Sequence, residues 1–310
     1  MTMMKAIVVH QYGGPDVLMY EDVPIPTPGE GDVLLKVEAA GVNPGETKIR
    51  QGAFAEYHTL PFILGFDLAG TVAALGPGVT QIAVGDAVYT NSDSTRNGGY
   101  AEFVAVRAAG VALRPKTLDA VHAASVPLAG LTAWQALSKE GGLTAGQTIL
   151  IHGAGGAVGS FAVQFAKVKG ASVIATATGE DLDYVRSLGA DVVIDYKTEK
   201  FEDVAKDVNV VLNTIAGETQ ARSWQTLRSG GILVATPGPP DQDAARAHGV
   251  LGKMVEVAPS AADLTEIAAL IDAGQVKTRV GLTFPLSEAR QAHERLEQGG
   301  THGKIVLIVA

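Results

Sequence analysis

The pattern of apolar and polar residues changes near residue 122. Before that point, short runs rich in β-branched residues are separated by Pro, Gly, Asn and Asp, which predicts strands joined by turns. The predicted strands cover residues 5–9, 33–42, 68–75, 87–90 and 100–106. The segment 23–29 holds three prolines, and we expect an extended connection there because proline fixes φ and lacks an N–H. The first part of the chain is therefore expected to be a β domain.

After residue 122, apolar strand patterns alternate with helical patterns, which is typical of a doubly wound parallel sheet. The predicted strands are 148–152, 172–176, 192–195, 208–213, 232–235 and 254–257, and the predicted helices are 156–169, 180–188, 218–227 and 261–273. A short strand, a helix over 287–297 and an apolar strand over 304–309 follow. Since a last strand needs a sheet, we expect it to return to the β domain. The predicted domains are residues 1–121 with 277–310, and residues 122–276.

Composition and charge exclude several classes of protein. The 310 residues are 46% hydrophobic and 18% charged, which indicates a globular protein with a large core. The net charge of -9, with no Lys/Arg cluster, disfavours a nucleic-acid partner. The chain has no cysteine, which removes disulfides, thiolate nucleophiles and every Cys-based zinc site, and fits a cytoplasmic location.

Neither a signal peptide nor a membrane span is expected. The first residues lack the long apolar core of a signal peptide. The uncharged stretch 141–166 is long enough to imitate a span, but it is rich in glycine and predicts a strand, a tight loop and a helix. We therefore expect no membrane partner.

The strongest chemical signal is a glycine cluster between the predicted strand at 148–152 and the predicted helix at 156–169. Glycines at this place permit a tight turn and the close approach of a pyrophosphate to the helix N-terminus. Ala154, Gly156 and Gly159 give the spacing A-x-G-x-x-G, and no Lys-Ser/Thr follows, so a P-loop is excluded. The residues expected to contact a dinucleotide are Gly155, Gly156, Ala157, Val158 and Gly159.

Four further segments agree with one family, in order along the chain. They are GVNPGETKIR at 41–50, LGFDLAGTV at 64–72, GGYAEF at 98–103 and PLAGLTAW at 127–134. Together with the glycine loop, they resemble the medium-chain dehydrogenase/reductases, and more narrowly the quinone oxidoreductase (zeta-crystallin-like) branch. The resemblance covers nearly the whole chain. It implies an α/β fold, with a GroES-like β domain built from both chain ends and a Rossmann nucleotide-binding domain.

The chain departs from the zinc-dependent members of this superfamily. Those members hold a catalytic zinc with a Cys and a His-Glu pair, whereas the region around Asn43 has no Cys and the pair is replaced by Phe66 and Asp67. We therefore expect no metal. Without a Lewis acid, hydride delivery to a quinone or an enone is easier than oxidation of an alcohol through an alkoxide.

The resemblance also implies site residues. It places Asn43 and Thr132 beside the nicotinamide, and Lys48 near cofactor and substrate. From the residues alone, Asn43 before a proline is a turn residue and Lys48 is a solvated lysine. Tyr57 is a candidate proton donor or pocket residue. Phe54, Tyr57 and Phe62 are the candidate walls of the substrate pocket.

Later strand ends are expected to contact the cofactor too, because ligands bind at the carboxyl edge of such sheets. The residues concerned are Thr214, Ile215, Thr236 and Pro237. His152, by contrast, is interpreted as a core histidine rather than as a catalytic base.

NADPH is predicted in preference to NADH. An acid at the end of the second strand selects NAD, and this chain has Thr178 there, 19 residues after Gly159. The resemblance adds Tyr196 as a neighbour of the 2′-phosphate. Glu180 and Asp181 argue against NADPH, because a strand end two residues later would place an acid at the ribose.

The sequence thus predicts an NADPH-dependent, zinc-independent reductase of quinones or α,β-unsaturated carbonyls. Two alternatives stay open, an NAD-dependent zinc-free alcohol dehydrogenase and a non-catalytic nucleotide-binding sensor or structural protein. A homodimer is also predicted, because the apolar strand near residue 254 comes last in its sheet and an unprotected edge tends to pair with another chain.

Overall fold

The computed structural model describes residues 2–309 and divides into two compact units. The first unit contains the chain up to Leu128, Pro259–Gly274 and the chain from Thr278 onward, and the second contains Ala129–Ala258 and Gln275–Lys277. The predicted fold class is confirmed, since one unit is a β domain and the other carries a parallel sheet covered by helices.

The first unit is built on a seven-stranded sheet in the order β15-β16-β3-β5-β6-β8, with β7 paired to β3. A smaller sheet has the order β2-β1-β4. The strands are β1 (Met3–Val9), β2 (Leu18–Pro24), β3 (Asp32–Val42), β4 (Phe62–Ile63), β5 (Asp67–Leu75), β6 (Ala87–Asn91), β7 (Phe103–Arg107), β8 (Val111–Leu113), β15 (Val280–Pro285) and β16 (Lys304–Ile308). Their apolar positions, including Leu35, Leu68 and Ile305, form one buried core.

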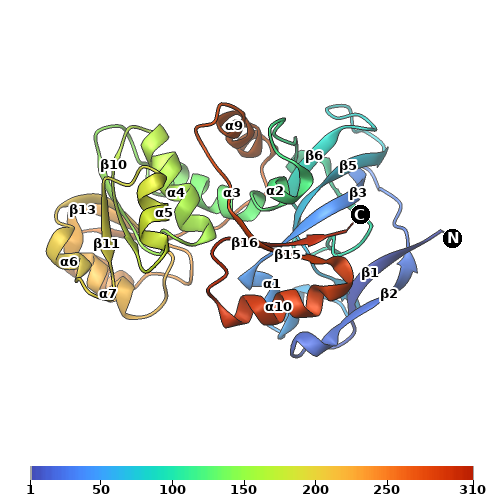
Figure 1. Ribbon diagram of the computed structural model, residues 1–310, viewed down its shortest axis with the longest axis horizontal. Helices are drawn as coiled ribbons and strands as arrows, with labels where there is room; N and C mark the ends of the chain where they lie inside the picture. Colours follow the sequence, from blue (N-terminus) through green and yellow to red (C-terminus); the bar gives the residue numbers. More distant parts are fainter. Residues whose placement is uncertain (1, 310) are drawn as a thin grey trace. The chain divides into compact units, whose positions relative to one another are not determined.

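The last strand returns to this unit, as predicted. β16 runs antiparallel to β3, with Ile305 opposite Val42, and Figure 1 shows the blue start and the red end of the chain in the same unit. The helix α10 (Ala289–Gln298) packs against β15 and β16. The sequence analysis did not predict β2, which pairs along its whole length with β1.

Three shorter helices and α9 (Ala261–Asp272) complete the first unit. These helices are α1 (Pro44–Arg50), α2 (Ala120–Ala124) and the start of α3 (Pro127–Gln135). The hydroxyl of Tyr89 donates to the Leu264 carbonyl, at 2.5 Å, and Thr117 donates to Asp272, so α9 is tied to the β domain. This division differs from the expected one, in which residues 122–276 belong together.

The second unit contains a six-stranded parallel sheet in the order β11-β10-β9-β12-β13-β14. The strands are β9 (Thr148–Ile151), β10 (Ser172–Ala177), β11 (Val192–Asp195), β12 (Val208–Asn213), β13 (Leu227–Ala235) and β14 (Leu251–Met254). β10 and β11 follow on one side of the β9–β12 pair, and β13 and β14 follow on its other side. This pair is therefore the switch point, at whose carboxyl edge ligands bind in such sheets.

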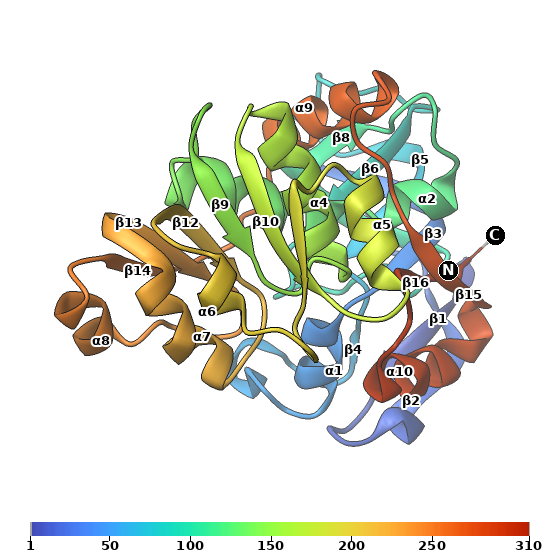
Figure 2. The ribbon, with the colours of Figure 1, turned by 60° about the vertical axis from the view of Figure 1, so that its left-hand side comes forward.

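Helices connect these strands. They are α4 (Ala157–Val168), α5 (Asp181–Ser187), α6 (Phe201–Val204), α7 (Glu218–Ser223) and α8 (Gln242–Ala247). Figure 2 shows α4 and α5 beside the sheet, where α4 packs against β9 and β10, and α5 packs against β10 and β11. The N-terminus of α4 therefore lies where β9 ends.

The predicted strand at 254–257 is wrong by three residues, because β14 is Leu251–Met254. Its partner β13 ends at Ala235, whose carbonyl still accepts a hydrogen bond from Val255 N, and Pro237 beyond it has no N–H. β14 does lie at an edge of the sheet, as expected. The pairing of this edge with a second copy stays a prediction.

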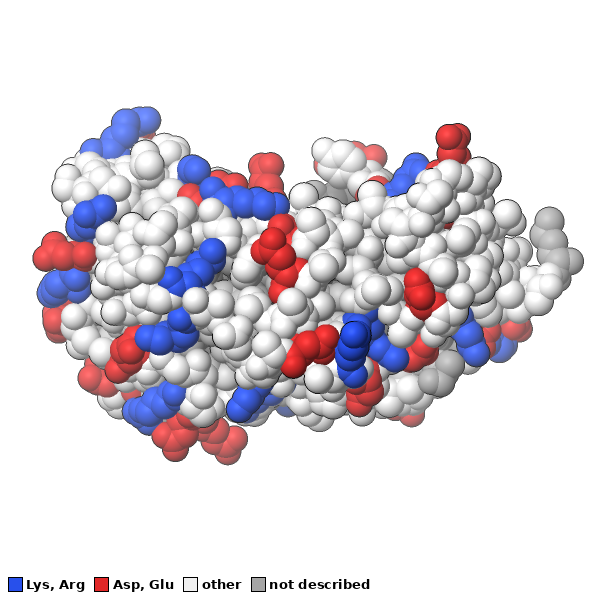
Figure 3. Space-filling view, turned by 90° about the horizontal axis from the view of Figure 1, so that it is seen from above, with Lys and Arg blue, Asp and Glu red and all other residues white. Residues whose placement is uncertain are grey.

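Two further observations concern the surface and the helices of residues 2–309. On the face shown in Figure 3, acidic and basic side chains are interspersed without a basic track of the kind that follows a phosphate backbone. Within residues 2–309, none of the helices combines the length and the apolar character needed to cross a bilayer.

Candidate functional site

The glycine turn after β9 is shaped by close backbone contacts. Gly153 has a φ of 68°, and a Cβ added there would lie 2.5 Å from Thr214 Oγ1. A Cβ on Gly159 would lie 2.3 Å from the carbonyl oxygen of Gly153, so the first turn of α4 packs directly on the loop. Gly156 is the exposed N-cap of α4. This is the arrangement that offers backbone N–H groups and the positive end of a helix dipole to a pyrophosphate.

A cavity of about 340 Å³ opens beside this turn, entirely within the second unit. Five of the residues predicted to contact the cofactor line it, namely Gly155, Gly156, Thr178, Tyr196 and Ile215. Tyr196 is half exposed. Charged side chains that the sequence analysis did not assign to a pocket also line it, namely Asp181, Glu199 and Arg222. The position, the size and the glycine-lined wall fit the adenosine half of a dinucleotide.

The carboxyl ends of β12 and β13 approach the same edge. Thr214 donates from Oγ1 to the His152 carbonyl at 2.8 Å, and Thr236 N donates to the Asn213 carbonyl at 3.0 Å. Pro237 is exposed directly after Thr236. Asn213 is fully buried, and its amide nitrogen has no hydrogen-bond partner among residues 2–309. A buried donor without a partner beside this turn is a further feature that suits a polar ligand.

His152 lies in the core of the second unit. Its ring nitrogens are within 3.2 Å of Thr176 Oγ1 and 3.0 Å of Ser223 Oγ, and its ring stands edge-on to Phe201. Burial is the main cause that lowers the pKa of His152 to about 3, with the charge of Arg222 adding to it. A neutral, hydrogen-bonded imidazole of this kind is a structural group.

In the first unit, Asn43 belongs to a buried polar cluster. Its amide nitrogen donates to Asp67 Oδ2 at 3.1 Å, and its amide oxygen accepts from the ammonium of Lys304. Lys304 Nζ is also 2.8 Å from Asp67 Oδ2, and both side chains are almost fully buried. Asp67 Oδ1 accepts from Asn91 Nδ2 and Leu128 N, at 3.0 and 2.7 Å. The orientation of the Asn43 amide is thereby fixed at both ends.

Glu46 connects this cluster to three further buried side chains, those of Tyr100, His293 and Arg50. Its carboxylate accepts from Asn43 N, from Phe66 N and from the Tyr100 hydroxyl, at 2.8, 3.0 and 2.6 Å. Burial raises the pKa of Glu46 to about 7, against the opposing effect of these hydrogen bonds. The Tyr100 hydroxyl lies 3.3 Å from His293 Nε2, and Arg50 Nη1 lies 3.2 Å from His293 Nδ1.

These hydrogen bonds assign the tautomer of His293. The Arg50 guanidinium has only donors, so Nδ1 accepts, and Nε2–H then donates to Tyr100, which donates to Glu46. Desolvation, followed by the charge of Arg50, lowers the pKa of His293 to about 3, which keeps its ring neutral. Each group in this chain of hydrogen bonds therefore donates to the next, from Arg50 to the carboxylate of Glu46.

The residues of this cluster do not fit a zinc ion. Phe66 takes part through its backbone N–H, and both oxygens of Asp67 accept hydrogen bonds, one of them from an ammonium group. Within residues 2–309, no three His, Asp or Glu side chains gather as metal ligands would. The donor set differs from the Cys and His ligands that a catalytic zinc requires.

The other predicted site residues lie on α1, at a short 3-10 helix and on α3. Lys48 is exposed on α1, and Tyr57 and Phe54 are exposed in and before a short 3-10 helix (Ala55–Tyr57). Thr132 is buried in α3 of the second unit. Of these side chains, none lines the nucleotide-sized cavity.

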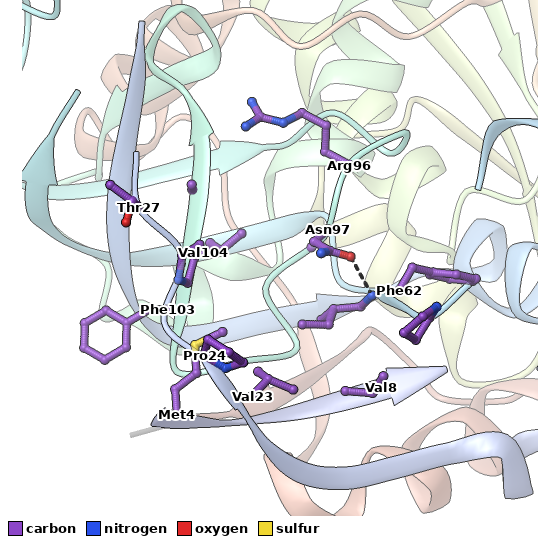
Figure 4. A pocket seen from close by; sticks show the side chains of 15 residues that line it. Met4, Val8, Val23, Pro24, Thr27, Phe62, Arg96, Asn97, Phe103 and Val104 are labelled. Atoms are coloured by element: carbon purple, nitrogen blue, oxygen red, sulfur yellow. Dashed lines mark hydrogen bonds between the residues drawn. The ribbon is translucent and has the colours of Figure 1, made fainter. Parts of the chain in front are cut away.

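A second cavity, of about 390 Å³, lies in the first unit between the small sheet and β7. Figure 4 shows Phe62, a predicted pocket wall, together with Met4, Val23 and Val104 along it, and Asn97 accepting from the backbone N–H of Ile63. The cavity shares no lining residue with the cluster around Asn43. Phe62 is therefore a wall of this cavity, whereas Phe54 and Tyr57 are not.

Comparison with known proteins identifies the family to which the chain belongs. Residues 29–116 match the family described as Alcohol dehydrogenase GroES-like domain, and residues 188–307 match Zinc-binding dehydrogenase. The chain is 34% identical to the quinone oxidoreductase of Mus musculus, over 99% of this chain and 98% of that protein. The chain belongs to the quinone oxidoreductase branch of the medium-chain dehydrogenase/reductases. The predicted family is thereby confirmed.

Two further relatives agree. The NADPH-dependent alkenal/one oxidoreductase, chloroplastic, of Arabidopsis thaliana is 38% identical over 98% of this chain and 79% of that protein. The solved quinone oxidoreductase from Coxiella burnetii superposes with a TM-score of 0.93 at 33% identity, with both chains fully covered.

The sequence analysis missed most of the polar cluster. Lys304 had a visible signal, because it is the one charge in an otherwise apolar last strand. Glu46 also had one, since Asn43 and Glu46 have the spacing of an N-cap and its third helical residue, with Pro44 at the first helical position. Tyr100, His293 and Arg50 come from distant segments, and no local pattern could have joined them.

Proposed function

We propose that this protein reduces quinones or α,β-unsaturated carbonyls by hydride transfer from NADPH, without zinc. The observation that carries the proposal is the glycine-lined cavity at the switch point of the second unit, beside the N-terminus of α4. The names of the relatives in mouse and Arabidopsis support the substrate class, and the latter supports NADPH.

When bound, the reduced nicotinamide supplies the hydride. The backbone at Gly155–Gly159 would hold the pyrophosphate, and Thr178 and Tyr196 would face the 2′-phosphate of the adenosine ribose. Asn43, fixed by Lys304 and Asp67, would position the nicotinamide, and Lys48 would supply a donor to a substrate carbonyl. Because the residues around Asn43 form hydrogen bonds and do not fit a zinc ion, an electron-poor double bond is a better substrate than a simple alcohol.

A substrate panel tests this function. We expect the purified protein to oxidise NADPH in the presence of small quinones or enones and to leave saturated aldehydes and simple alcohols almost unchanged. Turnover of simple alcohols with NAD⁺, without turnover of enones, would favour the alcohol dehydrogenase alternative. Cofactor binding without any turnover would favour a sensor.

The purified protein is expected to contain no stoichiometric zinc. The reason is the donor set, in which Phe66 offers no side-chain ligand and Asp67 is bound by an ammonium group. Elemental analysis checks the metal content, and turnover after treatment with a chelator is expected to equal turnover before it. About one zinc per chain, lost together with activity on chelation, would contradict the proposal.

Asn43→Ala is expected to lower kcat about 100-fold while changing the dissociation constant of NADPH by less than about threefold, because we propose that its amide positions the reacting ring and not the adenosine half. Asn91→Ala is the matched control. Asn91 is also buried and donates to Asp67, at 3.0 Å, so both variants remove one donor from the same carboxylate. Equal kcat values for the two variants would return Asn43 to a structural role.

A further inference from the structure

The side chain of Asp181 reaches back onto the glycine turn. Asp181 is the first residue of α5, and Glu180 before it is the N-cap. A Cβ added to Gly155 would lie 2.6 Å from both Cγ and Oδ2 of Asp181, so this carboxyl group rests against the backbone of the turn. Gly155 and Asp181 share the wall of the same cavity.

The strand end itself is where the sequence analysis expects it. β10 ends at Ala177, and Thr178 follows and lines the cavity. Asp181, three residues further on, begins α5, and the first turn of this helix directs its carboxyl group to Gly155.

The other charges of the cavity do not offset the negative charge of Asp181. Glu199 adds a second carboxylate. Arg222 is the one guanidinium in the lining, and it binds Glu202 through two hydrogen bonds, at 3.0 and 2.6 Å, while lying over the ring of Phe201. An acid in this part of a dinucleotide site accepts from the ribose 2′-hydroxyl and repels a 2′-phosphate.

We propose that Asp181 limits the selectivity of this site for NADPH, so that the protein also accepts NADH. The inference rests on the proposed function, because it concerns the cofactor of the same site. Asp181 is the proposed source of this limit. Replacing that residue therefore has opposite consequences for nucleotides with and without the 2′-phosphate.

Binding of adenosine nucleotides isolates this effect from catalysis. Asp181→Asn is expected to tighten the binding of 2′,5′-ADP about tenfold, measured by calorimetry, and to leave 5′-AMP unchanged or weaker. In steady-state kinetics, the ratio of kcat/KM for NADPH to that for NADH is expected to rise by at least the same factor. Asp181→Ser removes the same charge and keeps a residue that suits a helix start, so it replaces the first variant if that one folds poorly.

Asp183→Asn is the matched control. Asp183 lies in the same first turn of α5 and pairs with Arg186 at 2.7 Å, but it is 94% exposed and does not line the cavity. Equal effects of the Asp181 and Asp183 variants, or equal shifts for both nucleotides, would overturn this inference alone. Failure of the unaltered protein to bind either nucleotide would overturn the proposed function with it.

Discussion

Lys304→Met is expected to destabilise the protein by about 3–5 kcal/mol. The substitution removes one partner of a buried ion pair and leaves the charge of Asp67 shielded from solvent and without its counter-charge. Asp67 would keep its hydrogen bonds from Asn43, Asn91 and Leu128, which satisfy its oxygens but do not replace the ammonium charge. Urea-induced unfolding, followed by circular dichroism, measures the loss.

Lys5→Met is the control for this prediction. Lys5 also pairs with an aspartate at 2.8 Å, but its side chain is 41% exposed and that of Asp22 is 58% exposed, so its loss is expected to change the free energy of unfolding far less than the loss of Lys304. The double variant Asp67→Asn, Lys304→Met removes both charges and is expected to recover part of the stability. Equal losses for the two lysine variants would contradict the buried pair.

Gly159→Ala is expected to lower NADPH affinity more than 100-fold and to cost about 3 kcal/mol of stability. Its added Cβ would lie 2.3 Å from the Gly153 carbonyl oxygen and 2.7 Å from Ala154 Cα, and these are backbone atoms that cannot rotate away. The turn and α4 would separate, so the N–H groups at the helix start would no longer converge on a pyrophosphate. Quenching of protein fluorescence by NADPH and thermal unfolding measure the two effects.

Gly156→Ala is the control that distinguishes a loss of NADPH affinity from a loss of stability at the same turn. Its Cβ would meet only the Gly153 carbonyl oxygen, at 3.3 Å, and Gly156 is exposed at the N-cap. This variant is expected to stay within about 1 kcal/mol of the parent stability, because its methyl group would make one tight contact at an exposed position. Its NADPH affinity is expected to fall, because the methyl group would stand at the helix start proposed to hold the pyrophosphate. Loss of stability in Gly156→Ala alone, with Gly159→Ala unaffected, would contradict this account of the turn.

The fold could be predicted from the sequence wherever the apolar periodicity and the turn-forming residues indicate the same element. The alternation of strands and helices after residue 122 predicted β9 to β13, and the unpartnered apolar end predicted that β16 joins the first unit. The prediction failed at β14, where Val255 continues the apolar pattern although its partner strand has ended. A local pattern contains no information on where a neighbouring strand stops.

The site could be predicted only in part, for the same reason. The glycine turn is a local signal, and Gly155, Gly156 and Thr178 do line one cavity. The cluster around Asn43 joins α1, β5 and β16, and the contact between Gly155 and Asp181 joins the glycine turn to the start of α5. Such contacts depend on how side chains turn after the backbone is placed, and sequence spacing does not encode that.

The most direct test of the central claim follows a labelled hydride. Protein shown by elemental analysis to be free of zinc would be incubated with NADPH deuterated at C4 of the nicotinamide and with an α,β-unsaturated ketone, and the product would be analysed by NMR and mass spectrometry. The account predicts a saturated ketone with one deuterium at the β-carbon and a proton from water at the α-carbon. Deuterium at the carbonyl carbon of an allylic alcohol, or product formed only after zinc is added, would contradict it.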